Sequence, residues 1–146
     1  MSIAGSDCSG GAGIQADLKT ISALGAYAAT AITAITVQNT TGVRAIHPVP
    51  PVFVRGQIEA VMDDIRPDAI KIGMINDIEI VKVISACLHK YRPAYVIFDP
   101  VMVSTSGHKL IEDDAIAALT DDLMPLTSLI LSLIHISEPT RHSLIS

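Results

Sequence analysis

The first twenty residues hold the feature that most constrains the fold. A short apolar run passes through a turn almost free of side chains into a helical pattern, in the stretch IAGSDCSGGAGIQADLK from Ile3 to Lys19. Glycine is required where the backbone takes a positive φ or lets another group come close. Gly10, Gly11 and Gly13 therefore predict a strand–turn–helix unit whose helix N-terminus offers free N–H groups to a polar or anionic ligand. Packing of the strand against the helix would also require such glycines, so this alternative stays open.

Two nucleotide-binding motifs also use a glycine-rich turn before a helix. The turn in this chain is not a P-loop, because no Lys-Ser or Lys-Thr pair follows the glycines. Residues 11–16 match the dinucleotide pattern G-x-G-x-x-G/A, which also requires an acidic residue about 20 residues further on, at the end of the next strand. That strand ends instead in the amides Gln38 and Asn39. A dinucleotide-dependent oxidoreductase is therefore a disfavoured alternative, which detectable NAD(P) binding would support.

Apolar runs alternate with segments of helical period along the rest of the chain. The β-branched stretch Tyr27–Val37 predicts a buried, parallel strand. Further strands are expected at 69–72, 95–98 and 128–131. Helices are expected at 13–24, 52–65, 78–91 and 112–124. A short extended piece is expected at 43–49 and a loop at 101–109. The alternation implies βαβ units, and hence an α/β fold with helices on both faces of a mainly parallel sheet.

Composition limits the function classes. Hydrophobic residues make up 49% and charged residues 17% of the 146 residues, a balance typical of a sheet buried on both faces. The net charge of -5 and the lack of a basic cluster argue against nucleic acid as a partner. The most apolar stretch, Ala26–Val37, is too short to span a bilayer, and the first residues lack signal-peptide features. We expect Cys8 and Cys87 to be reduced thiols in a cytoplasmic protein with no membrane partner.

The predicted strand ends carry the least expected side chains of the chain. Ligands of an open parallel sheet bind beyond the carboxyl ends of its strands, so these residues should line one pocket. Gln38 could pair with the donor and acceptor edge of a heterocycle, Met74 could pack on its ring, and Asp99 could bind Mg²⁺ directly or through water. Each has a structural alternative: Gln38 could cap a loop, Met74 could fill the core, and Asp99 could shape a turn before Pro100.

Four segments, taken in order, resemble one known family. They read SIAGSDCSGGAGIQADLKTISALGAY, AITVQNTTGV, KIGM and DPVMVSTSG, and the likeness runs from Ser2 to about Ile130. Together they resemble the hydroxymethylpyrimidine/phosphomethylpyrimidine kinases of thiamine biosynthesis, which belong to the ribokinase-like superfamily. The resemblance implies a three-layer α-β-α fold. It also implies an enzyme that phosphorylates the hydroxymethyl group of 4-amino-5-hydroxymethyl-2-methylpyrimidine with MgATP and then phosphorylates the resulting monophosphate.

The resemblance further implies site residues, cofactors and partners. The pyrimidine pocket would be lined by Gly5, Asp17, Gln38, Met74 and Val101, and Asp99 would lie near Mg²⁺ and the phosphates. The implied cofactors are ATP and Mg²⁺, the implied partner is a small pyrimidine, and the full-length protein is expected to form a homodimer. Asp17 lies at the border of the apolar helix stripe, where an acid has no obvious packing use.

The end of the chain departs from the family pattern. After Ile130 the family continues into a second half that holds the nucleotide site, an anion hole and the catalytic group. Residues 131–146 instead read LSLIHISEPTRHSLIS, of which 131–141 match a translated sequencing adapter. We therefore expect residues 1–130 to form the N-terminal part of a kinase domain that is incomplete at its C-terminus. Residues 131–146 would be a non-native tail, and no catalytic residue is expected in this chain.

Two more alternatives remain besides the oxidoreductase. The first is a pyridoxal or pyridoxine kinase of the same superfamily, which a substrate panel would distinguish from a pyrimidine kinase. The second is a non-catalytic, pyrimidine-binding fragment, because the second half of the family pattern is absent from this sequence.

Overall fold

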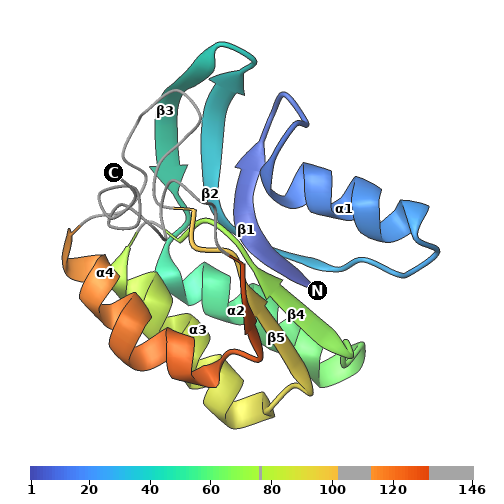
Figure 1. Cartoon of the computed structure of the whole chain (residues 1–146), viewed down its shortest axis with the longest axis vertical. Coiled ribbons are helices and arrows are strands. Elements are labelled where there is room, and N and C mark those ends of the chain that lie inside the picture. Colours follow the sequence, from blue (N-terminus) through green and yellow to red (C-terminus); the bar gives the residue numbers. More distant parts are fainter. Residues whose placement is uncertain (76, 102–112, 132–146) are drawn as a thin grey trace, which may run out of the picture.

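A computed structural model describes residues 1–75, 77–101 and 113–131 (Figure 1). The strands are β1 (Ser2–Asp7), β2 (Thr30–Asn39), β3 (Gly42–Pro48), β4 (Ala69–Ile72), β5 (Tyr95–Phe98) and β6 (Leu129–Ile130). The helices are α1 (Gly13–Ala23), α2 (Pro51–Asp64), α3 (Ile78–Tyr91) and α4 (Asp113–Ala118), the last continued by the π-helical turn η1 (Leu119–Leu123) and the 3₁₀ turn η2 (Met124–Leu126). Apart from Val101, the predicted loop at 101–109 lies outside the described residues, as do residues 132–146 of the predicted tail.

The strands form one sheet in the order β3-β2-β1-β4-β5-β6. Every neighbouring pair is parallel except β2 and β3, which are antiparallel, so the predicted mainly parallel sheet is confirmed. The short extended piece expected at 43–49 is in fact a full edge strand. It follows a tight turn closed by the side chain of Asn39, whose Oδ1 accepts hydrogen bonds from the backbone N and the hydroxyl of Thr41.

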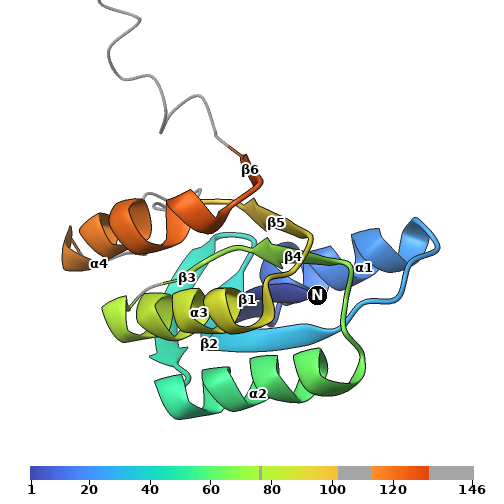
Figure 2. The same cartoon turned by 90° about the horizontal axis from the view of Figure 1, so that it is seen from below.

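Helices cover both faces of the sheet, as predicted. α1 packs on one face, whereas α2 and α3 lie on the other (Figure 2). The alternation of side chains along β1 shows the same division, because Ser2 bonds to a residue of α1 while Ile3 belongs to the core beneath α2 and α3. The main hydrophobic core therefore lies between the sheet and α2, α3 and η1, and its largest fully buried side chains include Phe98, Ile58, Ile80, Ile84 and Leu123.

Local signals explain which helix boundaries were predicted best. α3 begins after Asp77, whose carboxylate accepts a hydrogen bond from the backbone N of Glu79, 2.6 Å away, as an N-cap. Two predicted ranges differ from the structure by more than one residue. β2 begins at Thr30 rather than at Tyr27, whose side chain is 80% exposed. The helix expected at 112–124 becomes a π-helical turn at Leu119, so that its end is not regular α-helix. Among the described residues, no helix has the length and hydropathy needed to cross a bilayer.

Candidate functional site

One cavity of about 340 Å³ opens at the carboxyl ends of β1, β2, β4 and β5. Parallel α/β sheets bind ligands at this edge, and the volume lies in the range of small-molecule sites. All of the site residues implied by the resemblance line this cavity, namely Gly5, Asp17, Gln38, Met74, Asp99 and Val101. The structure thus brings together residues that are far apart in the sequence. Their roles in binding remain predictions.

The glycine turn is organised by Asp7, the last residue of β1. Its buried carboxylate accepts hydrogen bonds from the backbone N of Ser9, Gly11 and Ala12 at 2.8, 3.0 and 2.9 Å. The hydroxyl of Ser9 donates a fourth, at 2.7 Å. Burial raises the pKa of Asp7, but these hydrogen bonds outweigh burial and hold the pKa below its ordinary value. The amides of Gly11 and Ala12, next to the helix N-terminus, are therefore bound by a carboxylate of the chain itself.

The third glycine of the turn, Gly13, serves packing. Its φ of 56° lies in the left-handed region, and a Cβ at this position would collide with the carbonyl oxygen of Gly5. The strand β1 and the start of α1 therefore touch through bare backbone. At Gly11 and Gly13 the structure favours the packing alternative over the prediction of a free anion-binding turn.

Gln38 is held at the end of β2 by two residues that the sequence analysis did not assign to the site. The buried hydroxyl of Thr36 lies 3.1 Å from Gln38 Oε1 and 3.0 Å from the carbonyl oxygen of Ser6. Cys8 Sγ donates to the backbone oxygen of Gln38 at 3.0 Å and accepts from its backbone N at 3.4 Å. The Cys8 contacts anchor Gln38 to the loop after β1, whereas Thr36 holds the Gln38 side chain from within β2. Gln38 lines the cavity.

Met74 and Gly5 occupy the same wall of the cavity. A Cβ at Gly5 would lie 2.7 Å from Met74 Cε, so Gly5 provides the space for the thioether. The hydroxyl of Thr33, which is fully buried, donates to the carbonyl oxygen of Met74 at 2.9 Å and fixes its backbone. The wall can therefore present a polarizable side chain to a flat ring.

Three charged side chains lie close together near the carboxyl end of β4. Lys71 Nζ lies 3.2 Å from Asp17 Oδ2 and 3.6 Å from Asp99 Oδ2. Asp17 Oδ2 also accepts a hydrogen bond of 2.5 Å from the hydroxyl of Ser2. The prediction that Asp17 has no packing use was wrong, because it joins α1 to β1 and β4. Lys71 was missed, although a lysine inside the apolar strand sequence AIKI was a signal that could have identified it.

Asp99 is positioned by β4, since its backbone N donates to the carbonyl oxygen of Ile72 at 2.8 Å. Among the described residues, no group of three or more His, Cys, Asp or Glu side chains is placed to hold a metal ion. A single carboxylate nevertheless suits Mg²⁺ in phosphoryl transfer, where one or two carboxylates and the substrate phosphates hold the ion. Asp99 therefore fits a metal that arrives with a nucleotide.

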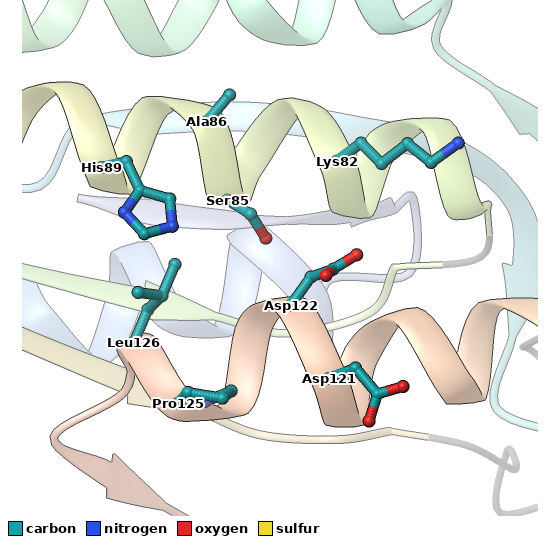
Figure 3. A pocket seen from close by; sticks show the side chains of 8 residues that line it. All are labelled: Lys82, Ser85, Ala86, His89, Asp121, Asp122, Pro125 and Leu126. Carbon is teal, nitrogen blue, oxygen red and sulfur yellow. The ribbon is translucent and has the colours of Figure 1, made fainter.

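A second hollow of about 450 Å³ lies between α3 and the η1 and η2 turns (Figure 3). Its walls include Lys82, Ser85, His89 and Asp122, and it shares no residue with the cavity at the strand ends. None of the predicted site residues lines this hollow. The strand-end cavity is therefore the candidate functional site.

The sequence of this chain matches a known protein family. Residues 7–134 match the family described as phosphomethylpyrimidine kinase. The hydroxymethylpyrimidine/phosphomethylpyrimidine kinase of Escherichia coli is 47% identical over 130 residues, which are 89% of this chain and 49% of that protein. The chain spans about half the length, or less, of the curated relatives it matches.

Solved structures agree with this comparison. The phosphomethylpyrimidine kinase of Clostridium difficile has 52% identity and a TM-score of 0.84, covering 88% of this chain and 56% of that chain. A pyridoxal kinase from Staphylococcus aureus, in complex with AMP-PCP and pyridoxal, has 36% identity and a TM-score of 0.75, covering 88% and 45%. Both neighbours are ribokinase-like kinases, so the predicted fold class is confirmed.

Proposed function

The chain belongs to the phosphomethylpyrimidine kinase family, and on this premise we propose that the protein phosphorylates a hydroxymethylpyrimidine and then its monophosphate. The phosphoryl donor would be ATP with Mg²⁺, and the first acceptor would be 4-amino-5-hydroxymethyl-2-methylpyrimidine. The observation that carries the proposal is the convergence of Gln38, Met74 and Asp99 on one cavity of suitable size.

Each of these residues has a chemical task in the proposed reaction. Gln38 would bind the aminopyrimidine edge, because its amide supplies both a donor and an acceptor and is held in place by Thr36. Met74 would pack on the ring. Asp99 would hold Mg²⁺, which would neutralise charge on the phosphoryl group that ATP supplies. Catalysis would then rest on positioning and electrostatic stabilisation rather than on covalent chemistry of the protein.

The proposal that ATP is the phosphoryl donor is supported by a structural neighbour rather than by residues of this chain. The pyridoxal kinase of 36% identity was solved with AMP-PCP, an ATP analogue. Because this chain spans about half the length of its relatives, we propose that the nucleotide site, the anion hole and the catalytic group lie outside these 146 residues. The 146-residue chain would then bind the pyrimidine without phosphorylating it. A homodimer of the complete protein is likewise a proposal.

The predicted division of the chain at Ile130 is also a proposal. The family match runs to residue 134, four residues beyond that division. Expression of residues 1–130 beside residues 1–146 would test it. If the tail is foreign, its removal should leave pyrimidine binding unchanged.

The proposed function is tested by incubating the complete protein that carries this sequence with MgATP and a substrate panel. Phosphorylation of hydroxymethylpyrimidine and of its monophosphate, with both products identified by mass spectrometry, is the expected result. Preference for pyridoxal would support the second candidate, a pyridoxal kinase, which the Staphylococcus aureus neighbour favours. Turnover of neither compound would contradict both.

A further inference from the structure

Acidic side chains outnumber basic ones among the described residues that line the cavity. Among the described lining residues, Asp7, Asp17 and Asp99 carry carboxylates, whereas Lys71 is the single cation. The carboxylate of Asp7 is occupied by backbone amides and the hydroxyl of Ser9, so its charge is compensated within the turn. The two remaining carboxylates share one ammonium group, which leaves that part of the cavity with a formal charge of minus one.

The position of Lys71 is built into the sheet. Lys71 and Ser2 are register partners in the parallel pair of β1 and β4, and both side chains reach Asp17. The neighbouring Ile70 and Ile72 point into the core and are fully buried. A Cβ at Gly73 would lie 3.1 Å from Lys71 Nζ, so the missing side chain at Gly73 leaves room for the ammonium group.

Lys71 keeps hydrogen-bonding capacity for a ligand. An ammonium group has three N–H donors. Its contact with Asp17 at 3.2 Å is a hydrogen bond, whereas Asp99 at 3.6 Å is an ion pair beyond hydrogen-bonding distance. The side chain is 26% exposed, on the cavity side. A second acceptor entering the cavity can therefore bind Lys71 without breaking its contact with Asp17.

We propose that Lys71 is the residue that lets this site accept a substrate already carrying a phosphate monoester. The inference rests on the proposed function, in which the second acceptor is the monophosphate formed in the first step. A phosphate monoester carries a charge between -1.5 and -2 at pH 7, which Asp17 repels, as does Asp99 when no Mg²⁺ is bound to it. Lys71 supplies the opposite charge and a charge-assisted hydrogen bond to a phosphate oxygen. The uncharged hydroxymethyl substrate does not need this contact.

The test compares both acceptors in the complete protein. Lys71→Met should lower kcat/KM for the monophosphate roughly tenfold to a hundredfold more than for the hydroxymethyl compound, because one charge-assisted hydrogen bond is lost. Lys71→Arg should retain most of the activity with the monophosphate. Lys82→Met is the matched control, since Lys82 is exposed on α3, pairs with Glu79 and lies outside the cavity. It should change neither activity.

Equal losses with both acceptors would overturn the inference and leave Lys71 as a residue that only holds Asp17 and Asp99. If Lys71→Met does not fold, Lys71→Gln gives the same comparison, because it keeps a hydrogen-bond donor without the charge. Calorimetric binding of the pyrimidine monophosphate without ATP separates this inference from the proposed function. Weaker binding of the monophosphate to Lys71→Met than to wild type supports the inference even if turnover fails. Turnover of the hydroxymethyl compound by a wild type that does not bind the monophosphate overturns it.

Discussion

The backbone of Gly13 lies so close to the carbonyl oxygen of Gly5 that no side chain fits between them. Gly13→Ala should therefore destabilise the protein by roughly 2–5 kcal/mol, the sum of overpacking and a left-handed backbone at a non-glycine residue. Chemical denaturation, followed by circular dichroism, measures this change. Gly56→Ala is the matched control, because Gly56 is exposed inside α2 with no atom near its Cβ position. It should stabilise the protein by about 0.5–1 kcal/mol.

Gln38→Leu should weaken pyrimidine binding while leaving the fold intact. The change leaves the polar edge of the ligand without a partner, at a cost of about 1–3 kcal/mol, or roughly tenfold to more than a hundredfold in Kd. Isothermal titration calorimetry is the direct measurement. Asn39→Asp serves as the control, since its Oδ1 can still bind Thr41 and Asn39 does not line the cavity. Unchanged affinity of Gln38→Leu would exclude Gln38 from pyrimidine recognition.

Asp17→Asn should affect both binding and stability. The asparagine oxygen can still accept a hydrogen bond from Ser2, but the ion pair with Lys71 is lost. Because this pair is partly exposed, the loss of stability should be about 1 kcal/mol or less. We expect pyrimidine affinity to fall severalfold in the same variant. Thermal unfolding and calorimetry on one preparation distinguish the two effects, and a large loss of stability with normal affinity would assign Asp17 a purely structural role.

Asp7→Asn should reveal a pH-dependent contribution to stability. The folded-state pKa of Asp7 is depressed, so its carboxylate stabilises the fold fully above its unfolded pKa of about 3.9. That contribution is lost as the pH falls through the folded-state pKa. The stability difference between wild type and Asp7→Asn should therefore be constant near neutral pH and shrink in acid. Urea unfolding at several pH values measures it, and a difference independent of pH would contradict the assignment.

Local sequence signals determined much of the architecture. The ranges predicted for β4, α3 and β5 agree with the structure at every residue. Short apolar runs between turn residues and a helix that starts after the capping residue Asp77 are properties of neighbouring residues, which the sequence displays directly. The convergence of Gln38, Met74 and Asp99 was also predictable, because the carboxyl ends of parallel strands meet at one edge of the sheet.

The tertiary structure alone decided which polar groups bind one another between different segments of the chain. The pairing of Lys71 with Asp17 depends on the register of β1 against β4, which places Ser2 and Lys71 side by side beneath α1. The occupation of the Gly11 amide by Asp7 likewise depends on how the chain turns after β1. Such contacts join residues whose spacing in the sequence has no fixed relation to their distance in the fold. Periodicity could therefore predict the edge of the sheet that holds the site, but not the ion pairs and hydrogen bonds that shape it.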